Sequence, residues 1–280
     1  MSKGLLDPKV DFVFKNIFGS PNHPEILISF LNATLKAKKK IVNVDIKKTD
    51  IEKQYIEDKY SRLDVKATTS NDEIINIEIQ LKNENNMVKR SLYYLSKMYE
   101  EQLNEKEDYS KLVRTVCINI LNFKYLKTDN FHTGYRFKEI ESNEELTDIM
   151  EVHFIEIPKL QDSSDEKDML VAWTEFLKDP ESEKVRGLEL SIEEIRQAKD
   201  ELIRMSNDST QRELYDMRAN SLRDKMSELN AAERKGIEKG REEGRKEEKI
   251  EIARNMKLSG LDINTIAKIT NLSEDEIDKL

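Results

Sequence analysis

The chain of 280 residues contains one cysteine and three histidines. A single cysteine, Cys117, excludes an internal disulfide and a cysteine-rich metal site, so we expect it to be a small core residue. His23, His132 and His153 lie far apart in the sequence, and we expect surface or sheet positions for them rather than metal ligation. There is also no glycine-rich phosphate loop, nucleophile elbow or zinc spacing. The mechanisms that depend on those motifs are therefore excluded.

Long apolar runs are missing as well. No stretch approaches the roughly 20 apolar residues that a membrane-spanning helix needs. The first residues, Met1–Lys9, lack the apolar core of a signal peptide. Hydrophobic and charged residues each make up 37% of the chain, which indicates one compact core with long solvated helices. We expect a cytoplasmic protein without a membrane partner.

The net charge of −9 is unevenly distributed. Residues 1–160 carry 25 Lys and Arg against 26 Asp and Glu, whereas residues 161–280 carry 22 against 30. The first part is therefore close to neutral and can bind a phosphate backbone locally, although it has no large basic field.

The stretch Arg62–Lys82 has the most regular pattern in the chain. Apolar residues alternate with polar ones on both sides of a polar run, Thr69–Glu73, as expected of a hairpin of two half-buried strands. An antiparallel hairpin centred on Asn71 pairs positions whose numbers sum to 142. Val65 then faces Ile77, and on the other face Asp64 lies opposite Glu78.

Two carboxylates opposite each other destabilise a strand pair. A divalent cation between Asp64 and Glu78 removes this repulsion, because Mg²⁺ selects oxygen ligands. An ordinary solvated face, with Asp64 paired to Lys66 or Arg62, explains the same alternation.

Asp64 followed by Glu78-Ile79-Gln80 resembles the PD-(D/E)xK nucleases, in particular the recombination-promoting nuclease/putative transposase branch, where Gln replaces the motif lysine. The flanking blocks Asp11–Gly19 and Arg90–Ser96 agree with it. The resemblance implies a restriction-endonuclease-like α+β fold, in which helices flank a central mixed β-sheet and a helical C-terminal region follows.

The resemblance also implies site residues. Asp64 and Glu78 are expected as Mg²⁺ ligands, or Mn²⁺ ligands, with Asp11 as a further acidic contributor. Gln80 occupies the place of the motif lysine and can hydrogen-bond a water, but it carries no charge. Lys82, two residues on along the same strand face, could supply the cation.

Two further cations are candidates for nucleic-acid binding. Arg90 begins the helix that follows the hairpin and is a plausible phosphate contact. Lys66 lies beside Asp64 on its strand face and is a second candidate for the missing charge.

The remaining pattern predicts helices and strands around the hairpin. The helix at Val88–Leu103 should bury the stripe Val88, Leu92, Leu95, Tyr99 and Leu103. The other expected helices are Asp7–Phe18, Glu25–Lys36 and Met169–Leu177, and the other expected strands are Ile41–Ile46, Leu112–Leu121, Phe131–Phe137 and Ile149–Ile157. We expect a nuclease-like domain at 1–160, a helical region at 161–230 and a charged tail at 231–280.

Within the tail, Gly236, Gly240 and Gly244 share one helix face. Each costs about 1 kcal/mol of helix stability relative to alanine, so close packing against a second copy is one explanation and a frayed, solvated helix is the other. Beyond them, Asp262 can cap one short helix and Ser273 another. This spacing resembles a helix-turn-helix, but its last helix is acidic, and we favour assembly over DNA reading.

The sequence thus predicts a metal-dependent DNA endonuclease that forms homo-oligomers through its C-terminal helices. The alternative is a catalytically weak nuclease-like module that binds DNA or recruits a partner. Gln80 in place of the motif lysine keeps this alternative open.

Overall fold

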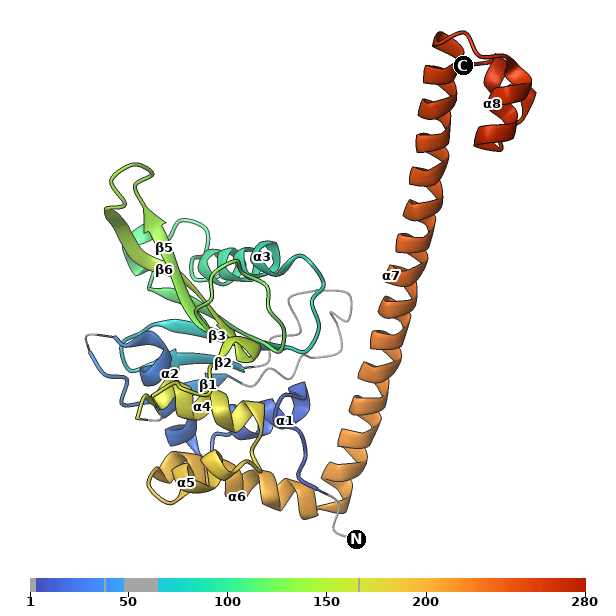
Figure 1. The fold of residues 1–280 in the computed structure, drawn as a ribbon. Helices are drawn as coiled ribbons and strands as arrows, with labels where there is room; N and C mark the ends of the chain where they lie inside the picture. Colours follow the sequence, from blue (N-terminus) through green and yellow to red (C-terminus); the bar gives the residue numbers. More distant parts are fainter. Residues whose placement is uncertain (1–3, 38, 48–64, 166) are drawn as a thin grey trace. The chain divides into compact units, whose positions relative to one another are not determined.

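The computed structural model describes residues 4–37, 39–47, 65–165 and 167–280. The chain divides into two compact units, residues 1–219 and 220–280 (Figure 1). Each unit is described by itself below.

A mixed sheet of six strands forms the centre of the first unit, in the order β1-β2-β3-β4-β6-β5. The parallel strands β3, β4 and β6 lie in the middle, while β1, β2 and β5 pair antiparallel with their neighbours. The strands are β1 (Val44–Lys47), β2 (Val65–Thr69), β3 (Ile74–Gln80), β4 (Thr115–Leu121), β5 (His132–Lys138) and β6 (Glu145–Glu156). The predicted mixed-sheet α+β fold is confirmed.

Helices cover both faces of this sheet (Figure 1). One face carries α3, and the other carries α1, α2 and α4, with α5 and α6 packed beyond them. These helices are α1 (Asp11–Phe18), α2 (Pro24–Leu35), α3 (Met87–Glu100), α4 (Met169–Lys178), α5 (Glu183–Glu189) and α6 (Glu193–Asn207). Residues 161–219, which the sequence analysis placed in a separate helical region, belong by their contacts to the first unit.

The hairpin of β2 and β3 has the register that its alternation predicts. Val65 pairs with Ile77 and Ala67 with Ile75, so the paired numbers sum to 142. Asp64, the predicted partner of Glu78, lies outside the described residues.

Aromatic side chains from three helices form the core beneath the sheet. Phe18 of α1 stacks on Phe14 with ring centroids 4.6 Å apart, and it meets Phe30 of α2 at 5.4 Å and Trp173 of α4 at 5.3 Å. Edge-to-face aromatic pairs add to the area that these side chains bury. Trp173 is fully buried.

The predicted buried face of α3 is confirmed at Leu95 but wrong at Val88 and Leu92. Val88 and Leu92 are 40% and 48% exposed, and the helix instead buries Met87, Ser91, Tyr94, Leu95 and Met98. The reason is the sheet beneath, which offers an apolar patch for Leu95 and Tyr94 but also a polar one that accepts Ser91 and the guanidinium of Arg90. Helical periodicity alone cannot detect such a mixed face.

The second unit consists of residues 220–258 of the long helix α7 (Ser209–Leu258) and two short helices, α8 (Ile263–Thr270) and α9 (Glu274–Asp278). Ala253, Ile266, Leu272 and Ile277 form its small core. Both predicted caps are present: Asp262 accepts from the backbone N–H of Thr265, and Ser273 and Glu276 form a reciprocal capping box.

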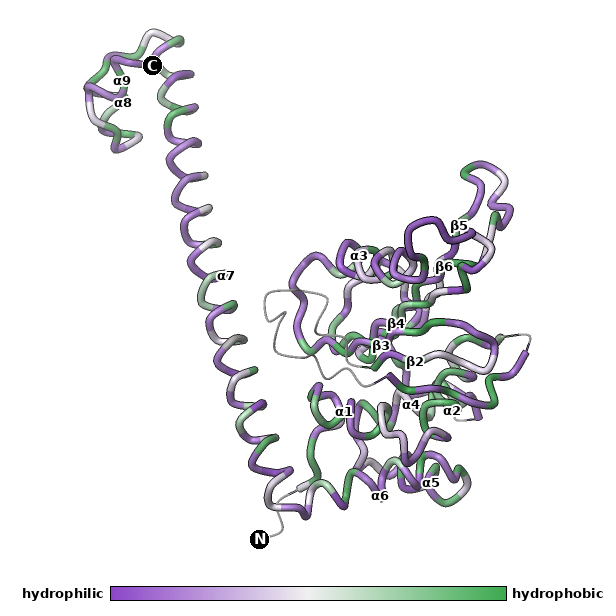
Figure 2. Tube along the Cα trace, turned by 180° about the vertical axis from the view of Figure 1, so that it is seen from behind, coloured by the Kyte–Doolittle hydropathy of each residue, from purple (hydrophilic) through white to green (hydrophobic). Residues whose placement is uncertain are grey.

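The middle of α7 is polar on most of its surface (Figure 2). At Gly236, Gly240 and Gly244 an added Cβ would meet no atom of the described part of the chain within 4 Å. None of the helices in the described residues is both long enough and apolar enough to span a membrane.

Candidate active site under helix α3

Glu78 lies on β3, on the strand face that α3 covers, and its side chain is 1% exposed. The hairpin alternation places it there, because Ile75, Ile77 and Ile79 occupy the opposite face. A buried carboxylate requires a charged or hydrogen-bonding partner. The surroundings of Glu78 therefore decide what this position can do.

Arg90 supplies one partner. Its Nε donates a hydrogen bond to Oε2 of Glu78 at 3.2 Å, and its guanidinium lies over the ring of Tyr94, 5.3 Å from the centroid. Glu84 is a more distant neighbour, with 3.9 Å between its Oε2 and the Arg90 NH1. Arg90 therefore contacts only one of the two oxygens of Glu78, Oε2.

The other oxygen, Oε1 of Glu78, is buried and has no hydrogen-bond partner among the described residues. The same holds for Oδ1 of Asn76, which precedes Glu78 on the same strand face. Burial raises the pKa of Glu78, and the nearby charge of Arg90 opposes that rise. Two buried oxygens without partners among the described residues, one from a carboxyl group and one from an amide, form a hard donor set that suits Mg²⁺.

No group of three or more His, Cys, Asp or Glu side chains within the described residues is placed to hold a metal ion. Asp64, the predicted second ligand, lies outside that part of the chain. Among the described residues, the unpaired Oε1 of Glu78 is therefore the observation that favours a bound cation.

Gln80 and Lys82 lie at the carboxyl edge of the parallel strands. Gln80 is the last residue of β3, and its backbone oxygen accepts a hydrogen bond from the N–H of Asn122 at 2.9 Å. Ligands of open α/β sheets generally bind at this edge. Both residues are half-buried. Their side chains are therefore partly packed against the protein and partly accessible to a ligand from solvent.

The two other predicted site residues have partners of their own. Asp11 begins α1, and its Oδ2 lies 3.4 Å from NH1 of Arg218. Lys66 of β2 lies 3.8 Å from Glu101 at the end of α3. Asp11 therefore belongs to the helix layer on one face of the sheet, whereas Glu78 contacts α3 on the other face.

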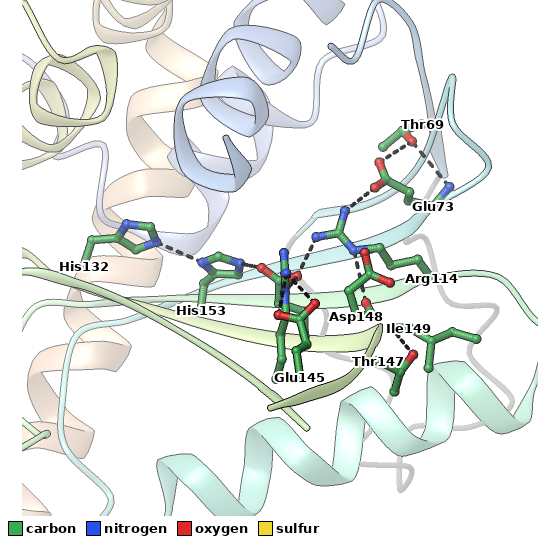
Figure 3. Close-up of polar contacts among 11 residues, drawn as sticks. Thr69, Glu73, Arg114, His132, Glu145, Thr147, Asp148, Ile149 and His153 are labelled. Atoms are coloured by element: carbon green, nitrogen blue, oxygen red, sulfur yellow. Dashed lines mark hydrogen bonds and ion pairs between the residues drawn. The ribbon is translucent and has the colours of Figure 1, made fainter. Parts of the chain in front are cut away.

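A second polar network, which the sequence did not indicate, crosses the sheet from the amino ends of β3 and β4 to the start of β5 (Figure 3). Nε2 of His132 lies 2.9 Å from Nδ1 of His153, whose Nε2 contacts Glu151. Arg114 then joins Glu151 to Glu73. The network links strands β5, β6 and the starts of β4 and β3.

Electrostatics in this network favour a fixed arrangement. Burial would raise the pKa of Glu151, but hydrogen bonds from His153, Arg114 and Arg136 together lower it to about 2. Burial lowers the pKa of His132 to about 4, and the neighbouring His153 adds to this. A neutral histidine and an ionised glutamate suit a structural role.

The remaining polar contact under α3 fixes the helix over the sheet. Ser91 donates to Oδ1 of Asn119 at 2.9 Å, and the amide of Asn119 donates to the backbone oxygen of His153 at 3.1 Å. Cys117 lies beside Asn119 and is fully buried, and burial raises the pKa of its thiol to about 12. The expectation that Cys117 is a core residue is confirmed.

Comparison with known families agrees with this arrangement. Residues 8–232 match the model described as the PD-(D/E)XK nuclease family transposase. Residues 246–280 match the model described as the Rpn/YhgA-like nuclease family, C-terminal HTH domain. No curated protein and no solved structure matched the chain.

Proposed function

Because the chain belongs to the PD-(D/E)XK nuclease family transposases, we propose that it is a metal-dependent endonuclease that hydrolyses phosphodiester bonds in DNA. The observation that carries this proposal is the buried Glu78, whose Oε1 has no partner among the described residues. A bound cation would satisfy this oxygen and remove the cost of burying it.

Glu78 and Asp64 are the proposed ligands of Mg²⁺ or Mn²⁺, with Asp11 as a further acidic contributor. A bound divalent ion supplies an activated water and stabilises charge on the phosphate. Arg90 would orient Glu78 by holding Oε2, so that Oε1 is left for the ion. Asp11 would have to exchange its contact with Arg218 for this role.

Gln80 and Lys82 would act on the attacking water and on developing charge. The amide of Gln80 can hydrogen-bond the water without changing the charge of the site. Lys82 follows two residues later, about 6.6–6.8 Å along the strand direction, and a lysine side chain can span much of that distance.

Arg90 and Lys66 are the proposed nucleic-acid contacts within the site. Each already lies near a carboxylate, Arg90 at 3.2 Å from Glu78 and Lys66 at 3.8 Å from Glu101. To bind a phosphate, each side chain would first have to break its contact with that carboxylate. The lost contact limits the net gain in DNA affinity.

We also propose self-association through α7. The faces of Gly236, Gly240 and Gly244 have open space around them, which leaves room for the backbone of a second copy. The match of residues 246–280 to an HTH domain supports DNA binding by the tail as a further role.

The test is cleavage of supercoiled plasmid by the full-length chain with Mg²⁺ or Mn²⁺, with EDTA as the control. Glu78→Gln keeps the shape of the side chain and the hydrogen bond to Arg90, but removes the charge that a cation requires. We expect it to lose more than about 100-fold in rate, above the 10–100-fold usual for residues outside the ligand shell. Cleavage that persists in EDTA or in Glu78→Gln contradicts the proposal. DNA binding without cleavage supports the alternative of a nuclease-like binding module.

A further inference from the structure

The loop between β4 and β5, residues 122–131, begins directly beside the proposed active site. Asn122 follows β4, and its N–H donates to the backbone oxygen of Gln80 at 2.9 Å. Because β3 and β4 are parallel, the loop leaves the sheet at the same edge where Gln80 ends its strand. Its first residues are therefore within one or two side-chain lengths of the catalytic strand.

A buried ion pair holds this loop in place. Nζ of Lys159 lies 2.6 Å from Oε2 of Glu156, and the two side chains are only 6% and 1% exposed. Glu156 accepts from the backbone N–H groups of Tyr125 and Leu126, and Lys159 donates to the backbone oxygens of Leu126 and Thr128 at 2.7 and 2.6 Å.

Such a pair is poor evidence for stability, because desolvation offsets most of the attraction. Its contacts here go almost entirely to the backbone of the β4–β5 loop. Phe123, Tyr125 and Leu126 also pack against the apolar cluster under α3. The effect is to fix the course of the loop across the carboxyl edge of the sheet.

Two lysines project from this fixed loop. Lys124 and Lys127 are exposed, and neither forms an ion pair or a side-chain hydrogen bond with the residues that the structure describes. Asp129 is the only acidic residue of the loop. Unlike Arg90 and Lys66, these lysines can meet a phosphate without first leaving a carboxylate.

We propose that the β4–β5 loop is a nucleic-acid contact, in which Lys124 and Lys127 bind backbone phosphates next to the bond that is cleaved. The partner is a polyanionic strand, recognised by charge and not by base identity. The rigid anchor by Glu156 and Lys159 sets the position of the strand relative to Gln80. This inference rests on the proposed nuclease function and assigns a substrate-binding surface to it.

The experiment measures DNA binding apart from cleavage. A labelled duplex is titrated by fluorescence anisotropy with the full-length protein, in Ca²⁺ without Mg²⁺, between 50 and 200 mM salt. The test variant is Lys124→Ala with Lys127→Ala. We expect weaker binding and a slope of log K against log salt that is shallower by about 1.8, because each lost phosphate contact removes about 0.9.

Matched variants distinguish a specific contact at Lys124 and Lys127 from the effect of lowering the net positive charge of the protein. Lys106→Ala with Lys138→Ala removes two exposed lysines at the opposite edge of the sheet, and it should keep the wild-type slope. Lys124→Arg with Lys127→Arg should keep it too, since the charge remains. In Mg²⁺, the test variant should need more DNA for half-maximal cleavage while the maximal rate stays within about twofold.

An unchanged salt slope in the test variant overturns the inference, as does an equal loss in the Lys106/Lys138 control. So does wild-type protein that binds no DNA. Wild-type protein that binds with the expected slopes but cleaves nothing leaves this surface standing and overturns the proposed hydrolysis. The two failures are therefore distinguishable.

Discussion

Arg90 donates to one oxygen of Glu78 at 3.2 Å and leaves the other oxygen buried and without a partner among the described residues. The two oxygens of one carboxylate are thereby given different environments. Oε2 is paired with the guanidinium of Arg90, and Oε1 remains available to a positively charged ligand.

The first prediction concerns the stability of this pair. Arg90→Met should lower the free energy of unfolding by about 3–5 kcal/mol, because it leaves the charge of Glu78 buried without compensation. Adding Glu78→Gln should recover much of that loss, since the buried group is then neutral. Urea unfolding of both single variants and the double variant gives the coupling energy. Additive losses would show that Arg90 does not act on Glu78.

The second prediction separates Gln80 from Lys82. Lys82→Ala should slow cleavage by roughly 10²–10³-fold, the usual effect of losing one electrostatic stabiliser, while Mg²⁺ binding measured by calorimetry stays intact. Gln80→Lys should be tolerated or raise the rate, because it restores the usual motif. A wild-type rate for Lys82→Ala would leave Gln80 or Lys66 for this role. An inactive Gln80→Lys would show that the amide itself is required.

The third prediction is acid sensitivity at His132. The pKa of His132 is lowered from 6.5 to about 4 in the folded chain, so the unfolded chain binds the proton more tightly. Stability from this site is complete above pH 6.5 and is lost as pH falls from 6.5 to 4. Between pH 7.5 and 4.5 the wild type should lose about 2–3 kcal/mol more than His132→Gln.

The surroundings of His132 set the control for this measurement. His153 and Glu151 face it from β6, and Lys36 and Asp168 face it from the helix layer. Glu151, with its pKa at about 2, stays ionised throughout the window. His23→Gln, which removes a histidine elsewhere, should keep the acid sensitivity of the wild type. Equal pH profiles for wild type and His132→Gln would contradict the prediction.

The fourth prediction concerns self-association through α7. Gly240→Leu places a large side chain where a second helix would approach, so light scattering should report a smaller particle than for the wild type. Gly240→Ala should stabilise an isolated α7 by about 1 kcal/mol, since an added Cβ meets no atom of the described residues within 4 Å. A monomeric wild type at high micromolar concentration would refute self-association.

Much of the fold follows from local pattern. Alternation of period two predicted β2, β3 and their register, since a slip by one residue would turn every apolar side chain to the wrong face. Caps predicted the helices that begin after Asp262 and Ser273. The family resemblance, carried by residues such as Asp11, Glu78 and Arg90, was confirmed by the match of residues 8–232.

Other features could not be predicted because they depend on contacts between distant parts of the chain. The network of His132, His153, Glu151, Arg114 and Glu73 joins residues that are separated by up to 41 positions. Single histidines and arginines in a sequence carry no sign of such partners. The helix α5 was also missed, because seven residues give too short a periodic signal.

The sequence by itself determined that Glu78 lies on a strand face with polar neighbours, because a side chain's face depends only on its position along the strand. The tertiary structure decided that this face lies under α3 and not in water. It also decided that Arg90 reaches Glu78 from that helix, and that Lys159 and Glu156 hold the β4–β5 loop beside Gln80. These outcomes depend on how the helices pack on the sheet. That packing is determined jointly by apolar and polar contacts between distant segments, so it cannot be derived from any one segment.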